Sequence, residues 1–185
     1  MRPDSGVGMQ RHLVKILDAW GTRMKFSVSA YLWFLFMLAV LATLQRDRIG
    51  LFLVPPFLTT LTILHLLPES PIAQPYPVIV GSTVSAGIGT VMAMLSRSTW
   101  AIVGATGLAF IVIHLLRAYH PPAVALSLYP SLLHPSVWFP LRVVLPFMVV
   151  AVVSAAALCR VLPGWPRYPV PLHAMRISPE IAERL

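Results

Sequence analysis

A cation and a titratable ring stand beside two prolines near the middle of the chain, in the run Arg117-Ala118-Tyr119-His120-Pro121-Pro122. Two consecutive prolines cannot continue a helix, because each lacks an N–H donor and its ring clashes with the preceding turn. Proline suits the first helical position, so we expect the arriving helix to end here and a short helix to run from Pro121 to Leu133. Free N–H groups at that start, beside Arg117 and His120, would attract a small anion.

The residues predicted to bind the anion combine these cations with neutral donors. They are Arg117, His120, the amides that follow Pro122, Ser127, and either Thr59 or Thr60. Arg117 and His120 are three residues apart and therefore share a helix face. An ionisable group inside a membrane span costs so much free energy that its presence indicates a function. Two plainer roles stay open: Arg117 can snorkel to the lipid headgroups, and His120 can end its helix through a backbone hydrogen bond.

Glu69 is the only acid near these motifs. It could pair with Arg117, carry a coupling proton, or cap a short helix that begins at Pro71, although Ser70-Pro71 already has the form of a cap followed by proline. His65 and His114 lack a carboxylate at ligand spacing and are interpreted as packed polar residues, so no metal site and no cofactor are predicted.

The composition is that of a membrane protein. Of the 185 residues 57% are hydrophobic and 11% are charged, with a mean hydropathy of +0.79, whereas a soluble domain averages about 25% charged residues. The net charge of +8 comes mostly from cations in the tails, without the aromatic platform of a nucleic-acid module, so no nucleic-acid partner is expected. The lipid bilayer is the expected environment.

Catalytic groups are scarce. Four of the six acids lie in the tails, and the chain shows no Ser/His/Asp set, metal cluster or phosphate loop, so we expect no enzyme. The single cysteine, Cys159, excludes an intramolecular disulfide and is interpreted as a small buried side chain.

Three regions divide the chain. Residues 1–25 are basic and place Leu13, Ile16, Leu17 and Trp20 at helical spacing, which is typical of an amphipathic helix on a membrane surface, with an ordinary solvated tail as the alternative. Residues 26–162 form the predicted transmembrane domain, and residues 163–185 form a basic C-terminal tail.

The fold predicted for 26–162 is all-α. Four apolar stretches are long enough to span a bilayer, namely Phe26–Leu44, Val78–Leu95, Trp100–Tyr119 and Trp138–Leu162. Two shorter ones are interpreted as broken or re-entrant half-helices: the part of Ile49–Leu67 that follows Pro55-Pro56, and Ala123–Leu133. A layout with six crossings stays open. The basic tails place both termini in the cytoplasm, in a bacterial inner membrane.

The two halves of the domain repeat an order of elements. Each reads as a span, a Pro-Pro pair, a short apolar segment, a Pro-rich break and a second span, which makes an internal two-fold repeat a candidate feature. In transporters, broken segments at matching places point to the substrate site. The span Val78–Leu95 carries small residues at four-residue spacing, which serves helix packing or lines a pore. Because four spans scarcely enclose a pathway, we also expect a homo-oligomer.

Several motifs resemble one family. His120-Pro121-Pro122-Ala123, the upstream run Pro68-Glu69-Ser70-Pro71-Ile72-Ala73-Gln74-Pro75 and the Gly81-bearing span are similar to those of the HPP family of integral membrane proteins, over about Ile49 to Leu162. The resemblance implies four membrane-spanning helices and a transport role, with nitrite passage in plant and cyanobacterial members. Tyr76-Pro77 stands where the family has Arg-Asn, so one anion contact is missing here.

Transferred by position, the resemblance marks His120, Pro121, Pro122, Pro71, Gln74, Pro75 and Gly81. Together with the residues chosen above, the expected site therefore comprises Thr59, Thr60, Glu69, Ser70, Gln74, Gly81, Arg117, His120, Pro121, Pro122 and Ser127. The expected function is an integral membrane transporter or channel for a small, nitrite-like anion. The alternative is a membrane scaffold or partner subunit that transports nothing.

Overall fold

The structure is a computed structural model that describes residues 28–44, 50–96 and 98–170. The predicted amphipathic segment 1–25 and residues 171–185 of the basic tail lie outside the described residues. The chain divides into two compact units, 1–35 and 36–185. The predicted domain boundaries at residues 25 and 162 stay predictions.

Every regular element within the described residues is a helix, as the composition predicted. The longer helices are α2 (Val28–Leu44), α3 (Gly50–Leu66), α4 (Ser82–Leu95), α5 (Thr99–Leu115) and α8 (Leu145–Val161). The short elements are η1 (Pro71–Ala73), η2 (Pro77–Gly81), α6 (Pro121–Leu126), α7 (Tyr129–Leu133) and η3 (Pro140–Val144).

Two continuous helices in the described residues are long and apolar enough to cross a membrane. They are Pro77–Leu95, which joins η2 to α4, and Pro140–Val161, which joins η3 to α8. α2 and α5 are apolar helices of 17 residues each. Both long helices begin with a single π-helical turn led by a proline, which takes the first position where its missing N–H has no helical partner.

The predicted break at Pro55-Pro56 is wrong, because α3 continues through both prolines as one helix. A proline lacks the N–H that bonds the carbonyl four residues earlier, so α3 passes through Pro55-Pro56 without two of its helical hydrogen bonds. The hydroxyls of Thr59 and Thr60 donate to the carbonyls of Pro55 and Pro56 at 2.7 and 3.0 Å, a bond that threonine often makes within a helix.

The short helix begins at Pro121 as predicted, but it does not reach Leu133 unbroken. It divides into α6 and α7, with the N–H groups of Ser127 and Leu128 bonded to carbonyls three residues back. Pro130 supplies no N–H for the carbonyl four residues earlier, which ends the first helix. The arriving helix α5 also stops earlier than expected, at Leu115 rather than Tyr119.

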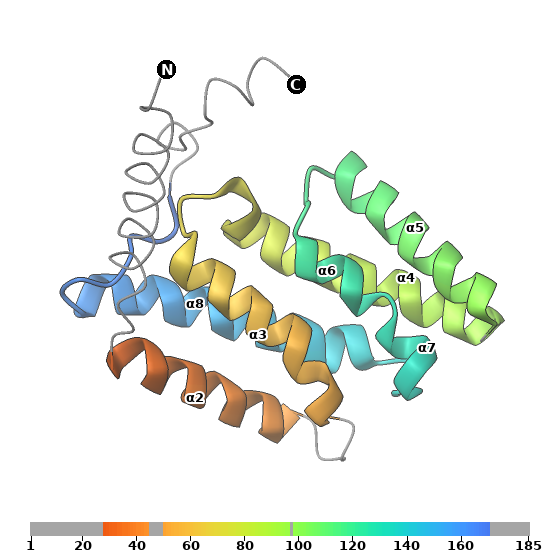
Figure 1. Ribbon diagram of the computed structural model, residues 1–185, viewed down its shortest axis with the longest axis horizontal. Helices are drawn as coiled ribbons and strands as arrows, with labels where there is room; N and C mark the ends of the chain where they lie inside the picture. Colours follow the sequence, from red (N-terminus) through yellow and green to blue (C-terminus); the bar gives the residue numbers. More distant parts are fainter. Residues whose placement is uncertain (1–27, 45–49, 97, 171–185) are drawn as a thin grey trace, which may run out of the picture. The chain divides into compact units, whose positions relative to one another are not determined.

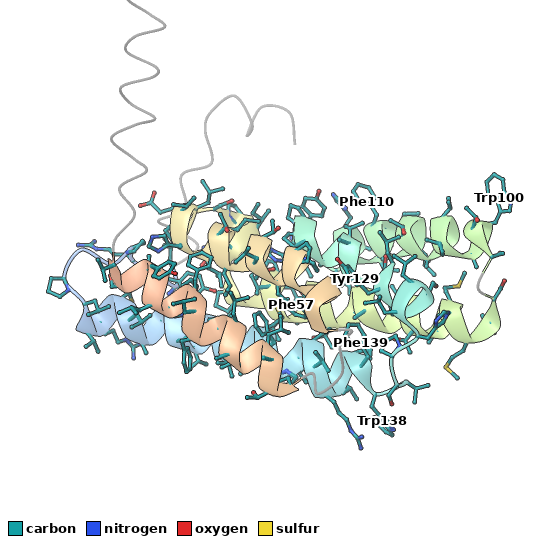
Figure 2. The ribbon with its side chains drawn as sticks, turned by 60° about the horizontal axis from the view of Figure 1, so that its bottom comes forward. Phe57, Trp100, Phe110, Tyr129, Trp138 and Phe139 are labelled. Carbon is teal, nitrogen blue, oxygen red and sulfur yellow. The ribbon has the colours of Figure 1, made fainter. Side chains whose placement is uncertain are left out.

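Within the second unit α4 occupies the centre, in contact with α5, α6, α7 and α8 (Figure 1). Its buried face carries the small residues predicted for close packing, which are Gly81, Ser82, Ser85, Ala86 and Gly89. α3 packs on α8 through the rings of Phe57 and Phe147, whose centroids are 4.4 Å apart. Trp100 and Phe110 of α5 and Trp138 near η3 point outward, as lipid contact requires (Figure 2).

Candidate functional site at the chain break between α5 and α6

Helix α5 ends in a Schellman motif. The N–H of Arg117 donates to the carbonyl of His114 at 2.9 Å, and the N–H of Ala118 donates to the carbonyl of Ile113 at 2.8 Å. Arg117 has a φ of 52°, the left-handed conformation that glycine usually supplies at this position. The hydroxyl of Tyr76 donates to the carbonyl of Leu116 at 3.1 Å. The chain therefore turns sharply here and is fixed to the Pro-rich segment before α4.

His120 is fully buried and stands at the N-cap position of α6 in extended conformation. Its Nδ1 lies 2.8 Å from the carbonyl oxygen of Ile72 in η1, and its Nε2 lies 2.9 Å from Oγ1 of Thr60 in α3. One imidazole thus joins α3, the Pro-rich segment 67–76 and the start of α6. Of the two threonines proposed from sequence, Thr60 reaches this ring. Thr59 is exposed and bonds only to its own helix.

The predicted set of free amides at the start of α6 is not formed. Pro121 and Pro122 have no N–H, and the first N–H available, that of Ala123, donates to the carbonyl of His120 at 2.9 Å. Two prolines make a good helix start, but they also remove two of the four donors that an anion would need.

Arg117 and His120 are not brought into one pocket, because the arginine side chain is exposed and the imidazole is buried. Glu69 is exposed, and in the part of the chain that the structure describes no ion pair joins it to Arg117. The charged side chains of the described residues, Glu69, Arg117, Arg142, Arg160 and Arg167, are all exposed. The polar core around His120 consequently has hydroxyls and carbonyls but no permanent charge among these residues.

Glycines on α4 allow α6 to lie against it. A Cβ added at Gly81 would overlap the carbonyl oxygen of Ala118, and one added at Gly89 would overlap that of Ser127. The Cβ of His120 lies 3.7 Å from the Cβ position of Gly81. Since Gly81 meets Ala118, three residues before α6, and Gly89 meets Ser127, directly after it, the two helices run in the same direction. Gly81 therefore positions His120.

Two hydroxyls on this face of α4 lack a protein partner. Ser82 and Ser85 are fully buried, and their Oγ atoms make no hydrogen bond within the described residues. Ser131 of α7, 6% exposed, shares this property. Sequence reasoning placed Ser82 and Ser85 on the packing face and did not choose them as site residues. The sequence feature that could have identified them is the three-residue spacing of two serines on a membrane helix whose other buried residues are small.

Gln74 holds the Pro-rich segment together. Its Nε2 donates to the carbonyls of Pro68 and Ser70 at 2.8 and 3.0 Å, and its Oε1 accepts from the N–H of Val170 at 3.1 Å. Ser70 occupies the N-cap position of η1, followed by Pro71 as predicted, but its side chain makes no capping hydrogen bond. These contacts are structural, and they leave Gln74 no free group for a solute.

The segment after α8 covers the same region. The ring of Trp165 lies 5.0 Å from that of His65, and the thiol of Cys159 donates to the carbonyl of Tyr168 at 2.9 Å. Burial raises the pKa of Tyr168 above its ordinary value, so its phenol stays neutral. Together with the bond from Val170 to Gln74, these contacts pack the start of the C-terminal tail against the Pro-rich segment.

The remaining predicted residues divide between core and surface. Pro122 and Ser127 are buried, and the hydroxyl of Ser127 donates to the carbonyl of Val124 at 2.7 Å, whereas Pro121 is exposed. The rings of His114, Phe110 and Tyr119 form a cluster in which the His114 centroid lies 4.4 Å from each of the other two, in tilted contacts. In the described residues no group of three His, Cys, Asp or Glu side chains could hold a metal ion.

Comparison with known families supports the membrane assignment. The family described as HPP, transmembrane region, matches residues 20–169, which is most of the chain and contains the whole site. Comparisons with curated proteins and with solved structures gave no match. A match of this extent confirms the resemblance seen in the His-Pro-Pro motif and the Pro-rich run before α4. The chain belongs to the HPP family of membrane proteins.

Proposed function

We propose that the protein is a transporter or channel for a small anion of the nitrite type. The observation that supports this most is the buried polar core at the chain break, where His120, Thr60, Ser82 and Ser85 are all fully buried within a membrane bundle. Burial of polar and ionisable groups inside a membrane protein costs free energy, and such groups commonly line the pathway of a solute. The nitrite passage implied by the family resemblance supplies the class of solute.

The arrangement of the breaks supports the same proposal. Each half of the domain contains an apolar helix of 17 residues, a Pro-Pro pair and a long helix that begins with a Pro-led π turn, at Pro77 and at Pro140. We propose that these halves form an internal two-fold repeat, as in transporters whose substrate site lies between repeats. Single π turns also occur frequently at functional sites.

Arg117 has a different role in this proposal from the one expected from sequence. Its guanidinium is exposed at the end of α5, outside the core that contains His120. An exposed cation raises the local concentration of anions in front of a pathway without binding them deeply. We therefore place Arg117 at the mouth of the pathway.

We further propose a homo-oligomer in a bacterial inner membrane, with no enzymatic activity and no cofactor. The outward face of α5 supports self-association, because a Cβ added at Gly107 would meet nothing, and one added at Gly104 would meet only the Met92 side chain at 3.6 Å. Small residues on an outward membrane helix let a second helix approach closely.

The proposal is tested by flux. Purified protein in liposomes should release internal nitrite faster than protein-free liposomes do, and chloride and formate rank its selectivity. Arg117→Gln should lower this flux several-fold at low salt and less at high salt, because steering by an exposed charge is screened. The matched control is Arg142→Gln, which removes another exposed arginine that lies 5.5 Å from the Trp138 ring.

The scaffold alternative makes the opposite prediction. Both ring nitrogens of His120 contact protein atoms, which a purely structural histidine would also do. Liposomes with protein that release none of the three anions faster than empty ones would favour the scaffold and contradict the proposed function.

A further inference from the structure

The unpartnered hydroxyls of α4 differ from the other hydroxyls of that helix. Thr83 and Thr90 donate to the carbonyls of Ile79 and Ala86 at 2.7 and 2.8 Å, as hydroxyls in membrane helices ordinarily do. Ser82 and Ser85 make no such bond, although they are 0% exposed. A buried hydroxyl without a partner is unfavourable, so two of them on one face indicate a bound solute that supplies the partner.

These hydroxyls lie on the face of α4 that packs against α6, the helix that begins directly after His120. Ser85 is four residues from both Gly81 and Gly89, which meet the two ends of α6, so it faces α6. Ser82 shares that face, three residues earlier. Gly81, adjacent to Ser82, has its Cβ position 3.7 Å from the Cβ of His120. A small solute held by the two hydroxyls would therefore lie between α4 and α6, on the face where Gly81 meets the Cβ of His120.

The hydrogen bonds of His120 suit two protonation states. The carbonyl of Ile72 can only accept, so Nδ1 carries a hydrogen. The hydroxyl of Thr60 has one hydrogen, which it can donate to the carbonyl of Pro56 or to Nε2. If it donates to Pro56, Nε2 must donate to Thr60 and the ring carries two hydrogens.

The neutral ring requires only a rotation of that hydroxyl. Thr60 then donates to Nε2, and the carbonyl of Pro56 keeps the backbone N–H that a helix ordinarily provides. No heavy atom has to move between the two states. His120 can therefore gain and lose a proton while it continues to join α3, η1 and α6.

The charges around His120 determine whether a proton on its ring could compensate a bound anion. In the described part of the chain the groups found against His120 are Thr60 from α3, the Ile72 carbonyl from η1 and Gly81 of η2, none of them charged. The other histidines and the one acid of the described residues are engaged or exposed: His65 packs on Trp165, His114 contacts Tyr119, and His134 and Glu69 are exposed. An anion bound alone would remain uncompensated, whereas a proton on His120 would neutralise it.

We propose that Ser82 and Ser85 donate hydrogen bonds to the transported anion, and that His120 takes up one proton with each anion. The two then cross together as a neutral pair, and both are released on the other side. This inference rests on the proposed function and adds its binding residues and its coupling ion. It makes the protein a proton and anion symporter.

Proton coupling is tested with nitrite in proteoliposomes that contain a pH-sensitive dye, with valinomycin and potassium used to set the membrane potential. We expect about one proton per nitrite, no response to the potential, and uphill accumulation driven by a pH gradient. Protein-free liposomes correct for leakage of nitrous acid. Protein-dependent flux that follows the potential without proton movement overturns the symport and leaves the proposed function intact. No flux above the empty liposomes overturns both.

Variants test the residues. Ser82→Ala combined with Ser85→Ala should lower nitrite flux about tenfold or more with no loss of folded protein, because neither hydroxyl has a protein partner to lose. The control Thr83→Val removes a hydroxyl from the same helix that is bonded to its own backbone, and its flux should match that of the wild type. Equal flux in the double serine variant overturns the binding role.

His120→Gln keeps hydrogen-bonding capacity but cannot titrate, so proton movement should be lost. One proton per nitrite in this variant overturns the role of His120. Should the variant fail to fold, Thr60→Val tests the same role of His120. Without the hydroxyl, Nε2 of the ring loses its hydrogen-bond partner in both protonation states. The pH dependence of flux should then shift, and an unchanged profile contradicts the proposal.

Discussion

At His120 a single side chain joins three segments that are distant in sequence. The ring contacts Thr60 in α3 and Ile72 in η1, and its own backbone begins α6. Buried networks of this kind fix one arrangement of the chain, because the loss of any member leaves the others unsatisfied where water cannot replace it. The residue that names the family motif is therefore structural in its contacts as well as a candidate carrier of a proton.

Adjacent threonines allow the structural part of this role to be measured. Thr60→Val should lower the free energy of unfolding by about 1–3 kcal/mol, because Nε2 of His120 loses its only side-chain partner in a buried site. Thr59→Val removes an exposed hydroxyl that bonds within its own helix and should change stability by less than about 0.5 kcal/mol. Thermal unfolding in detergent compares the two. Equal effects would show that the bond to His120 contributes nothing particular.

At the scale of the element, α4 organises the site through its small residues. Gly81 and Gly89 are backbone contact points for the chain on either side of α6, and the serines between them face the same helix. Lipid provides no hydrophobic force between membrane helices, so close backbone approach has to provide the packing. The serines proposed to bind the anion, Ser82 and Ser85, lie on this same packing face, so the proposal assigns packing and function to one face of α4.

Glycine substitutions test this close approach. Gly81→Ala should destabilise the protein by about 1–3 kcal/mol or more, because the added Cβ overlaps the carbonyl oxygen of Ala118 and the backbone must shift. Gly107→Ala is the matched control in α5, where an added Cβ meets nothing, and it should be neutral or stabilise by up to about 1 kcal/mol. If the two variants unfold at the same temperature, α6 does not rest on Gly81 in the membrane.

For the whole molecule the open question from sequence was four crossings or six. α3 is one continuous helix of 17 residues and not a half-helix, and we propose that it crosses the membrane. With a cytoplasmic N-terminus, six crossings put Ser98 outside the cell, whereas four crossings put it inside. His134 is outside in both layouts and serves as a positive control.

We therefore expect a cysteine at Ser98 to react with an impermeant maleimide in intact cells, in a Cys159→Ala background that removes the native thiol. Ser98 and His134 are both exposed, so the thiols are accessible from whichever side they face. Labelling of Ser98→Cys only after the membrane is permeabilised, with His134→Cys labelled in intact cells, would support four crossings.

The sequence by itself determined the class of the protein, the start of α6 and the buried face of α4, because each of these depends on the residue types within one segment. Composition established a helical membrane protein, the double proline located the start of α6 at Pro121, and small residues identified the buried face of α4. Only the tertiary structure decided that α3 passes through Pro55-Pro56, that Thr60 and not Thr59 meets His120, and that Arg117 and His120 are separated. The contact of Thr60 with His120 and the separation of Arg117 from His120 depend on how distant segments pack where water is absent, and spacing along one chain does not contain that information.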